Sequence, residues 1–514
     1  MSLSRLCDRI LRWGLVALIA FTPLAFGTVE GWSIAVMEWG IVSLLLLFGL
    51  DRFWPGRPRT VRRPGLWGLG IPIVLFLLLA VLQTVPIPLS WLEGVSPGSA
   101  RMYDGVDLER IEAAYPQIGG DDEVDWLHRL QLPARRPVSV HPEETWKRIR
   151  LLGSLVALFF LVALWVDNAE RVVFVLSAAT IVGFLVGVHG LVQHLTWNGK
   201  IYWVRKVPPS SPFGPFVNHN HFAGYVEMLL PVVISLAFFL VVREGGRAWS
   251  AARPHGDRGL AAAAVRLSQD PRWGKGSLAL FVAVILVVAL LLSKSRGGIL
   301  SALAGGLILF VLIWKRIASR RLKWIIAGSL PAVAATLVLW IQPDGVLEGL
   351  GSYGSIQTEA SFRQRLMVWR SAAENLPRFV WVGSGLGTFE SSFAPFTPPG
   401  TARRWDKAHN DYLQILWETG VVGFGLVAAG GLVFVRRYWW AAVRGRGESQ
   451  DLLRLGIAVS LLSIALHSIV DFNLQIGANG FLCAVLAGVL VSLRHVEERA
   501  RARPVPVGSG RAAT

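Results

Sequence analysis

The sequence predicts an all-α, polytopic integral membrane protein with about 12 transmembrane helices. Hydrophobic residues make up 53% of the 514 residues and charged residues only 17%, and the mean hydropathy is +0.49. One globular core could not bury that much apolar side chain. The apolar residues also gather in runs long enough to cross a hydrocarbon layer of ~30 Å. This composition excludes a soluble enzyme.

The apolar runs follow one another along most of the chain. The first comes after Arg5, Arg9 and Arg12 and could be a secretory signal peptide, but a second run follows almost at once and no Ala-x-Ala cleavage site closes the first. We therefore expect a retained first helix. The predicted spans cover roughly residues 10–28, 33–50, 66–86, 149–166, 171–194, 221–242, 277–293, 297–314, 324–341, 414–435, 452–471 and 477–493.

The net charge of +17 comes largely from basic clusters that lie between the spans. Clusters follow the second, sixth, eighth, tenth and last spans, so they all fall on one side in a twelve-span count. The positive-inside rule places that side and both termini in the cytoplasm. Topology thus explains the charge, and nucleic acid is not an expected partner. The clusters include Arg52 and Arg57, Arg243 and Arg247, Lys315 and Arg316, Arg436 and Arg437, and Arg494 and Arg499.

Two long segments are expected outside, at roughly 87–148 and 342–413. The first is rather acidic, is punctuated by prolines and shows no periodicity. The second contains SFRQRLMVWRSAAENL, in which Arg365, Trp369 and Arg370 have helical spacing, and then a glycine-rich turn, VGSGLGTF. That turn is not a dinucleotide fingerprint, because no strand precedes it. We expect three regions: residues 1–148 with the first helices and outer loop, a membrane core at 149–495, and a basic, disordered cytoplasmic tail at 496–514.

Neither the cysteines nor the histidines indicate a bound metal. Cys7 and Cys483 lie in or near apolar spans and have no plausible partner for a disulfide. The run NHNH at 218–221 has an i, i+2 spacing that suits metal ligation poorly, and no carboxylate or cysteine cluster completes a shell. An N-cap at the start of the sixth span is the favoured interpretation of this run. We expect no cofactor.

The turn between the seventh and eighth spans, SKSRGG at 293–298, puts two cations at the outer interface. A charge costs up to ~3 kcal/mol at the membrane centre and less near its edge. Lys294 is expected to reach the lipid headgroups. Arg296, next to two glycines, is the better candidate for a binding site, because a guanidinium holds phosphate oxygens in a bidentate manner.

The run AHNDYLQILWETGVVGFG combines a titratable side chain with a helix start. Asn410 or Asp411 is expected to cap the tenth span, which leaves free N–H groups and the positive end of the helix dipole beside His409. An imidazole can accept a proton from a hydroxyl near neutral pH. In a continuous helix His409 and Gly420 would share one face, with Gly423 slightly off it, and the glycines would admit another helix.

These groups suit a lipid-linked sugar diphosphate. Its phosphates would lie at headgroup depth beside Arg296 and Arg365, while its polyprenyl tail would lie in a groove between spans. His409 would deprotonate an acceptor hydroxyl that attacks the anomeric carbon, and the arginines would stabilise the leaving diphosphate. No metal is required if arginines supply the positive charge.

The chain resembles the bacterial O-antigen ligase and polymerase family over roughly residues 150–495. A His-Asn pair beginning at His409, nine further residues and then Gly-Val-Val-Gly match every fixed position of that family's pattern. NHNHFAGY, SRGG, RLMVW with GSGLGTF, and HSIVDFNLQ also occur in family order. The resemblance implies a type C glycosyltransferase-like fold and metal-independent transfer from an undecaprenyl diphosphate-linked glycan at the periplasmic face of the inner membrane. It also implies that Arg296 and Arg365 hold the diphosphate and that His409 activates the acceptor.

Four further residues are candidates to support this site. Arg365 is favoured over Arg363 as the phosphate ligand, because it stands four residues before Trp369, as in relatives. Relatives also often carry Asn-x-Asn ahead of the sixth span. The supporting candidates are Asn410, Asn220, Arg363 and Lys294.

Several activities remain open. The acceptor could be the lipid A core for a ligase, a second lipid-linked glycan for a polymerase, or a protein for an O-oligosaccharyltransferase, and the first outer loop is larger than in typical ligases. The main rival is a flippase-like transporter of polysaccharide or lipid-linked oligosaccharide. Transporters place polar groups near the midplane and often show repeated halves, whereas these candidates gather at the outer face. A sensor or scaffold would need a soluble partner domain. Membrane lipids are the other expected partners.

Overall fold

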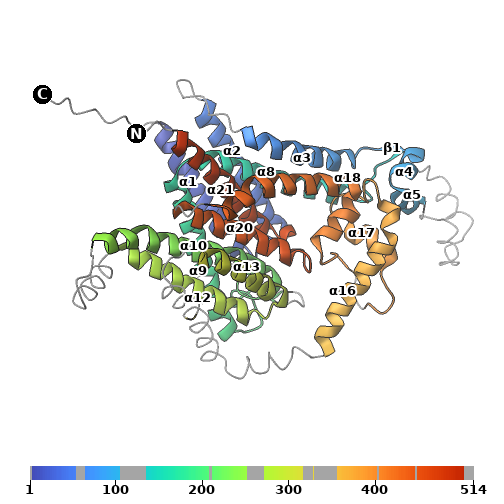
Figure 1. The fold of residues 1–514 in the computed structure, drawn as a ribbon. Coiled ribbons are helices and arrows are strands. Elements are labelled where there is room, and N and C mark those ends of the chain that lie inside the picture. The colour runs from blue at the N-terminus through green and yellow to red at the C-terminus, as the bar shows by residue number, and fades with distance from the viewer. Residues whose placement is uncertain are drawn as a thin grey trace, which may run out of the picture.

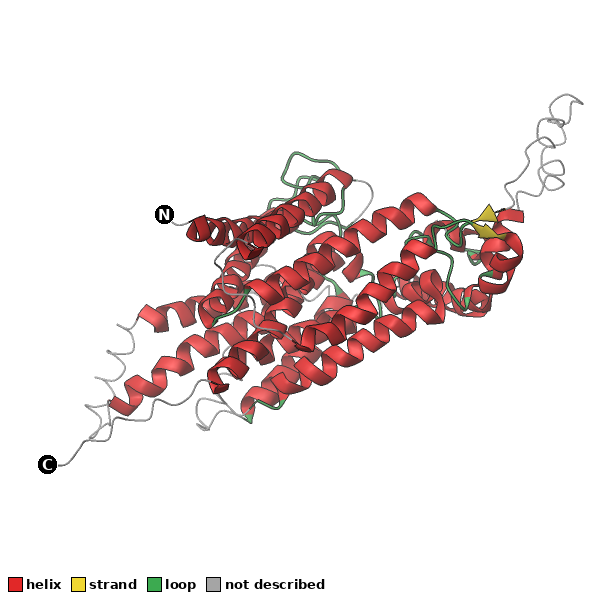
Figure 2. Ribbon diagram, turned by 90° about the horizontal axis from the view of Figure 1, so that it is seen from above, coloured by secondary structure: helices red, strands yellow, loops and turns green. Residues whose placement is uncertain are grey.

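The computed structural model describes residues 3–53, 64–104, 135–207, 211–251, 271–315, 328, 356–401, 405–445 and 449–502. Over these residues the chain consists of helices, loops and one short antiparallel pair, β1 (Ile87–Pro88) with β2 (Arg135–Arg136). Figure 2 shows a long bundle of helices with this pair at one end. The prediction of an all-α, polytopic membrane protein is confirmed.

The long helices correspond to the predicted spans. In the described part of the chain, 9 helices are long and apolar enough to cross a membrane, and α3 is a shorter apolar helix. α1 lies over the first predicted span but is not among these 9. The span predicted at 324–341 lies outside the described residues, apart from residue 328. The long helices are α1 (Leu3–Leu24), α2 (Gly31–Phe53), α3 (Pro64–Leu82), α8 (Pro142–Trp165), α9 (Ala169–Leu195), α10 (His219–Ala251), α12 (Pro271–Leu292), α13 (Arg296–Trp314), α18 (Asp411–Phe434), α20 (Ser449–His467) and α21 (Gly477–Ala502).

Several helices extend beyond the predicted spans, among them α8, α10, α12 and α21. α8 begins at Pro142 rather than near 149, because proline at the first helical position and two glutamates after it favour a helix start. α21 continues to Ala502, beyond the end of the last predicted span at 493. Residues 503–514 lie outside the described part of the chain.

α10 lies in the interior of the bundle, where it packs against α9, α12, α13 and α20 (Figure 1). Phe222 and Leu229 are among its many fully buried side chains. The peripheral α13 instead exposes Leu300, Leu303 and Leu307. A stripe of exposed leucines on a helix of this length is expected for a surface that faces lipid, where apolar side chains need no burial.

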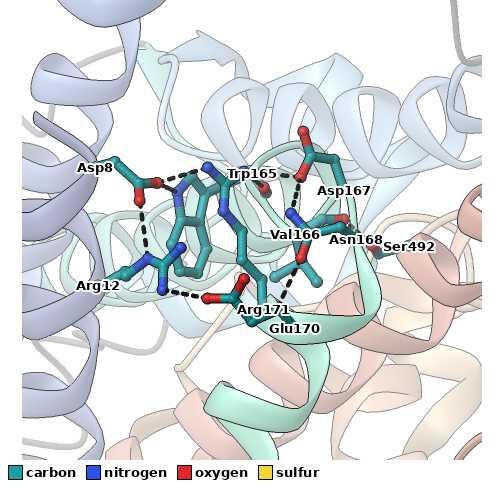
Figure 3. A network of polar contacts seen from close by, with 9 residues as sticks. All are labelled: Asp8, Arg12, Trp165, Val166, Asp167, Asn168, Glu170, Arg171 and Ser492. Atoms are coloured by element: carbon teal, nitrogen blue, oxygen red, sulfur yellow. Dashed lines mark hydrogen bonds and ion pairs between the residues drawn. The ribbon is translucent and has the colours of Figure 1, made fainter. Parts of the chain in front are cut away.

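An ionic network ties α1 to the turn between α8 and α9 (Figure 3). Arg171 donates to the Asp8 carboxylate at 2.6 Å and to the Trp165 carbonyl at 2.7 Å. Arg12 pairs with Asp8 at 2.8 Å and with Glu170 at 2.9 Å. Charges of both signs are thus neutralised where three helices meet. We call this end of the bundle, where α1 begins and α21 ends, the basic end (Figure 1).

The opposite end of the bundle carries a packed cap (Figures 1 and 2). Apolar side chains from α16, α17 and the turns beside them form its core around Trp417 of α18, which is fully buried. This segment is therefore a folded element with its own core, and we call this end the capped end. The cap consists of α4 (Leu89–Val95), α5 (Pro97–Asp104), α16 (Ile356–Asn375), α17 (Phe389–Phe393) and the 3-10 turns η2 (Leu376–Phe379) and η3 (Ala394–Phe396).

Three short elements complete the fold near the ends of α18 and α20. A π-helical turn, η4 (Val435–Trp439), and α19 (Trp440–Val443) extend α18 at the basic end. The 3-10 turn η5 (Asn473–Gln475) lies between α20 and α21 at the capped end.

α18 is not the continuous helix that would place His409 and Gly420 on one face. The helix begins only at Asp411, and Gly420 interrupts it with φ 62° and ψ −170°. This φ lies in the left-handed region that favours glycine. A Cβ at Gly420 would also clash with the carbonyl oxygen of Trp381. The expected helix-packing role is therefore wrong for Gly420, which instead admits the backbone of the cap.

The facing backbone of the cap is equally constrained. Gly383 has φ 75°, and a Cβ there would clash with the backbone of Glu418. Gln83, just after α3, joins both sides: its Nε2 donates to the carbonyls of Val382 at 2.6 Å and Glu418 at 2.9 Å, and its Oε1 accepts from the Leu386 N–H at 3.0 Å. The glycines of the VGSGLGTF turn thus serve close packing of cap against helix.

Replacing Gly420 by alanine should destabilise the protein by ~2–4 kcal/mol, because it adds a strained left-handed φ to a steric clash. Gly425→Ala in the same helix is the matched control, since nothing lies within 4 Å of a Cβ there. Thermal unfolding of the detergent-purified variants would measure both effects. Equal midpoints for the two variants would show that the break in α18 does not depend on Gly420.

The distribution of basic residues predicts that the capped end faces the outside of the cell. In a variant lacking Cys7 and Cys483, Arg370→Cys on the exposed surface of α16 should react with a membrane-impermeant maleimide in intact cells. Arg444→Cys, exposed after α19 at the basic end, should react only after lysis. The reverse labelling pattern would overturn this topology.

Candidate active site

A buried carboxylate, Asp471, lies in the turn between α20 and α21 at the capped end. Its side chain is 2% exposed, and its Oδ1 accepts from the Phe472 N–H at 2.9 Å and lies 3.1 Å from Nδ1 of His409. Nη2 of Arg365 lies 4.0 Å from its Oδ2. Two of the three residues predicted to carry the chemistry are thus gathered around one acid.

Asp471 is ionised in this setting. Burial by itself would raise the pKa of its carboxyl, but the hydrogen bond from His409 and the positive charge of Arg365 hold that pKa well below its ordinary value. An ionised carboxylate only accepts hydrogen bonds, so Nδ1 of His409 carries the hydrogen that the two groups share. Nε2 of the neutral ring then keeps a lone pair that can take a proton from a substrate hydroxyl.

The backbone and two aromatic rings fix the position of His409. Its φ of 49° lies in the left-handed region, which is uncommon for residues with a side chain and often occurs at functional sites. Asn410 follows as the N-cap of α18, and its Oδ1 accepts from the Leu413 N–H at 3.0 Å. The imidazole lies nearly perpendicular to the rings of Phe472 and Trp405, with centroids 4.9 and 5.7 Å away. Its side chain is 20% exposed, so it is held in place and still accessible.

Arg365 reaches the site from α16. Its Nη1 donates to the Val470 carbonyl at 2.5 Å, which places the guanidinium beside Asp471. Trp369, one turn later on the same face, donates to the Ala408 carbonyl at 2.7 Å. The four-residue spacing between arginine and tryptophan thus lets one helix face hold both the α20–α21 turn and the residue before His409.

Arg296 is the first residue of α13 and follows a tight turn. Ser295 is the N-cap: its Oγ accepts from the Gly298 N–H at 3.3 Å and donates to Oδ1 of Asn220 at 2.8 Å. A Cβ at Gly297 would lie 3.2 Å from the Val470 side chain. Val470 is therefore a shared neighbour. Its side chain lies against the turn that carries Arg296, and its carbonyl accepts from the guanidinium of Arg365.

The other predicted residues occupy different positions. Asn410 caps α18, and Asn220 anchors the turn before Arg296. Asn218 rather than Asn220 has the capping role at the start of α10, since its Oδ1 accepts from the Asn220 N–H at 2.8 Å. Lys294, with φ 59°, and Arg363 are both exposed. Arg363 lies two residues before Arg365 on α16, a separation that turns the two side chains to different faces.

Asp471 and His219 were not among the residues predicted to form this site. His219, at the start of α10, lies beside the Ser293 backbone and within electrostatic reach of Asp471 and Arg365. His221 is buried with its ring 4.9 Å from that of Phe472. The sequence did contain a signal for Asp471. It is an acid between two apolar spans on the side of the membrane that also holds His409, and a charge buried there requires partners. Among the described residues, no group of three or more His, Cys, Asp or Glu side chains could hold a metal ion.

An apolar cavity of about 750 Å³ lies between α3, α8, α18, α20 and α21. Its long walls are formed by residues such as Phe76, Leu155 and Phe434, while Asp411 and Gln475 line its polar end. Oδ1 of Asp411 accepts from Nε2 of Gln475 at 2.9 Å. Gln475 follows Asp471 by four residues, so this polar end lies close in sequence to the candidate site, although Asp471 and His409 do not line the cavity.

Comparison with known proteins agrees with the geometry. No curated protein matches the chain. Residues 281–428 match the family model described as O-antigen ligase. The matched segment contains Arg296, Arg365 and His409, and the bundle around it is that of a multi-pass membrane protein. The segment that contains these three residues is therefore similar to the O-antigen ligase family, in agreement with the resemblance that the sequence motifs indicate.

Proposed function

We propose that this protein transfers a glycan from undecaprenyl diphosphate to an acceptor hydroxyl at the periplasmic face of the bacterial inner membrane. The observation that carries the proposal is the contact of His409 Nδ1 with Asp471 at 3.1 Å, because it leaves Nε2 of the ring as a base beside Arg365.

The reaction is a substitution at the anomeric carbon. His409 Nε2 takes the proton of the acceptor hydroxyl while its oxygen forms a bond to the anomeric carbon. The bond from that carbon to the diphosphate oxygen breaks, and the electron pair leaves with the diphosphate. Arg296 and Arg365 bind the phosphate oxygens and stabilise the negative charge that develops on them. Asp471 orients the imidazole and balances its positive charge after it has taken the proton.

The cavity between α3, α8, α18, α20 and α21 supports a substrate that carries a hydrocarbon chain. This space is open to its surroundings and is lined almost wholly by apolar side chains, so it suits a hydrocarbon chain. Water does not fill apolar cavities readily. We assign the space to the polyprenyl chain of the donor, which would enter from the surrounding bilayer.

Transfer is favoured over transport by the place of the polar groups. Asp471 and His409 lie at the capped end of the helices, whereas a flippase needs its polar determinants near the bilayer midplane. The ligase, polymerase and protein O-oligosaccharyltransferase activities differ only in the acceptor. Lipid A core and a second lipid-linked glycan are the acceptors that the family supports, and we propose one of these.

Arg296→Ala and Arg365→Ala should each lower turnover by roughly 10²–10³, the usual cost of losing a donor to a developing negative charge. The lysine variants should recover part of the activity, because an ammonium keeps the charge but not the fork. Transfer of radiolabelled glycan in membranes, at matched expression, would measure this. EDTA should leave the wild-type rate unchanged. Near-normal turnover in an alanine variant would remove that arginine from the site.

His409→Ala should lower turnover by roughly 10²–10⁴ while leaving binding of undecaprenyl diphosphate largely intact, since the imidazole acts as a base. Asp471→Asn should lower turnover by about 10- to 100-fold, because it replaces a charge-assisted hydrogen bond worth ~1.5–3 kcal/mol. Asp406→Asn, an exposed acid three residues before His409, is the matched control and should be neutral. Loss of donor binding in His409→Ala would indicate a phosphate ligand instead of a base.

A further inference from the structure

A second acid and imidazole pair lies deeper in the bundle than the proposed site. Nδ1 of His467, the last residue of α20, is 3.1 Å from both carboxylate oxygens of Glu227 on α10. The side chains are 1% and 0% exposed. Burying such a pair costs desolvation that apolar side chains of equal size would avoid. Stability of the bundle therefore does not explain why these two residues are polar.

The pair lies directly under the turn that carries Arg296. A Cβ at Gly297 would lie 2.7 Å from Nε2 of His467, and one at Gly298 would lie 2.5 Å from the Ala223 side chain. Both glycines are therefore needed for the first turn of α13 to rest on α20 and α10. The imidazole of His467 is the surface on which the turn lies.

One face of α10 lies under this turn, directly at two residues and through His467 at a third. Asn220, Ala223 and Glu227 follow one another at spacings of three and four residues, which places them in a row on the helix. Asn220 accepts from Ser295, Ala223 packs where Gly298 lacks a side chain, and Glu227 holds His467. The row thus supports the Arg296 turn at three successive points.

We propose that Glu227 and His467 are positioning residues that fix the Arg296 turn for binding the donor diphosphate. The proposal rests on the proposed function of Arg296. A carboxylate bound to Nδ1 fixes the plane of the imidazole, and a fixed ring gives the turn one resting position. Apolar side chains would fill the same volume, but they would not define the orientation of the ring.

Binding of undecaprenyl diphosphate to the detergent-purified, full-length protein tests this role. Glu227→Leu keeps the volume and removes the acceptor, so it should weaken binding about tenfold, within the range of coupling between contacting residues. Glu227→Gln keeps an oxygen that can accept from His467, so it should recover most of the affinity. Arg296→Ala should weaken binding more strongly. The double variant Glu227→Leu/Arg296→Ala should bind no more weakly than Arg296→Ala alone.

Gly297→Ala and Gly305→Ala form a matched pair of packing variants. A Cβ at Gly305, two turns further along α13, would clash with Ser463 of the same helix α20. Only Gly297→Ala should weaken donor binding, although both disturb the contact between α13 and α20. Equal weakening by both would show that the pair serves helix packing alone.

The double variant also separates this inference from the proposed function. If Arg296→Ala binds the diphosphate normally, both the diphosphate site and the positioning role are overturned. If Arg296→Ala binds the diphosphate weakly, and the double variant binds more weakly still by the full effect of Glu227→Leu, only the positioning role is overturned. Thermal midpoints of all variants, measured in the same detergent, would show whether a loss of binding reflects unfolding.

Discussion

A single buried carboxylate joins three segments of this protein that are distant along the chain. Asp471, in the turn after α20, contacts His409 before α18 and Arg365 on α16. A charge with 2% exposure would be costly without these partners, and without the acid Arg365 would lose its counter-charge and His409 its hydrogen-bond partner. The groups that are proposed to carry out the reaction therefore also hold together the cap, the start of α18 and the turn between α20 and α21.

Local chemistry made much of this arrangement predictable. Apolar runs identified the spans, since a helix must be about 20 apolar residues long to cross a bilayer. Asn410 and the SKSRGG turn were recognisable because capping and tight turns depend on neighbours in sequence. His409, Arg296 and Arg365 were selected as polar groups placed between spans on one side of the membrane. None of these inferences required knowledge of which helices touch.

The parts that the sequence did not reveal depend on tertiary contacts. Asp471 becomes a partner of His409 only because the α20–α21 turn lies against the start of α18. Gly420 stands in a run whose pattern is that of a continuous helix, and its left-handed φ is imposed by the approach of Trp381. Glu227 lies in an apolar run and carries no local signal of its pairing with His467. Features of this kind can be recognised only once the packing of the helices is known.

The buried position of Trp417 affects the order in which the protein assembles during synthesis. Trp417 belongs to α18, whereas the aromatic rings around it, at Phe379, Phe389 and Phe393, come from earlier in the chain. Those rings leave the ribosome before their central partner, so the core of the cap is completed only when α18 follows them. Asp471 follows later still, on the last pair of helices. The pair of His409 and Asp471 is therefore completed only when the final helical hairpin has been made, and a nascent chain that ends before Asp471 lacks the acid that contacts His409.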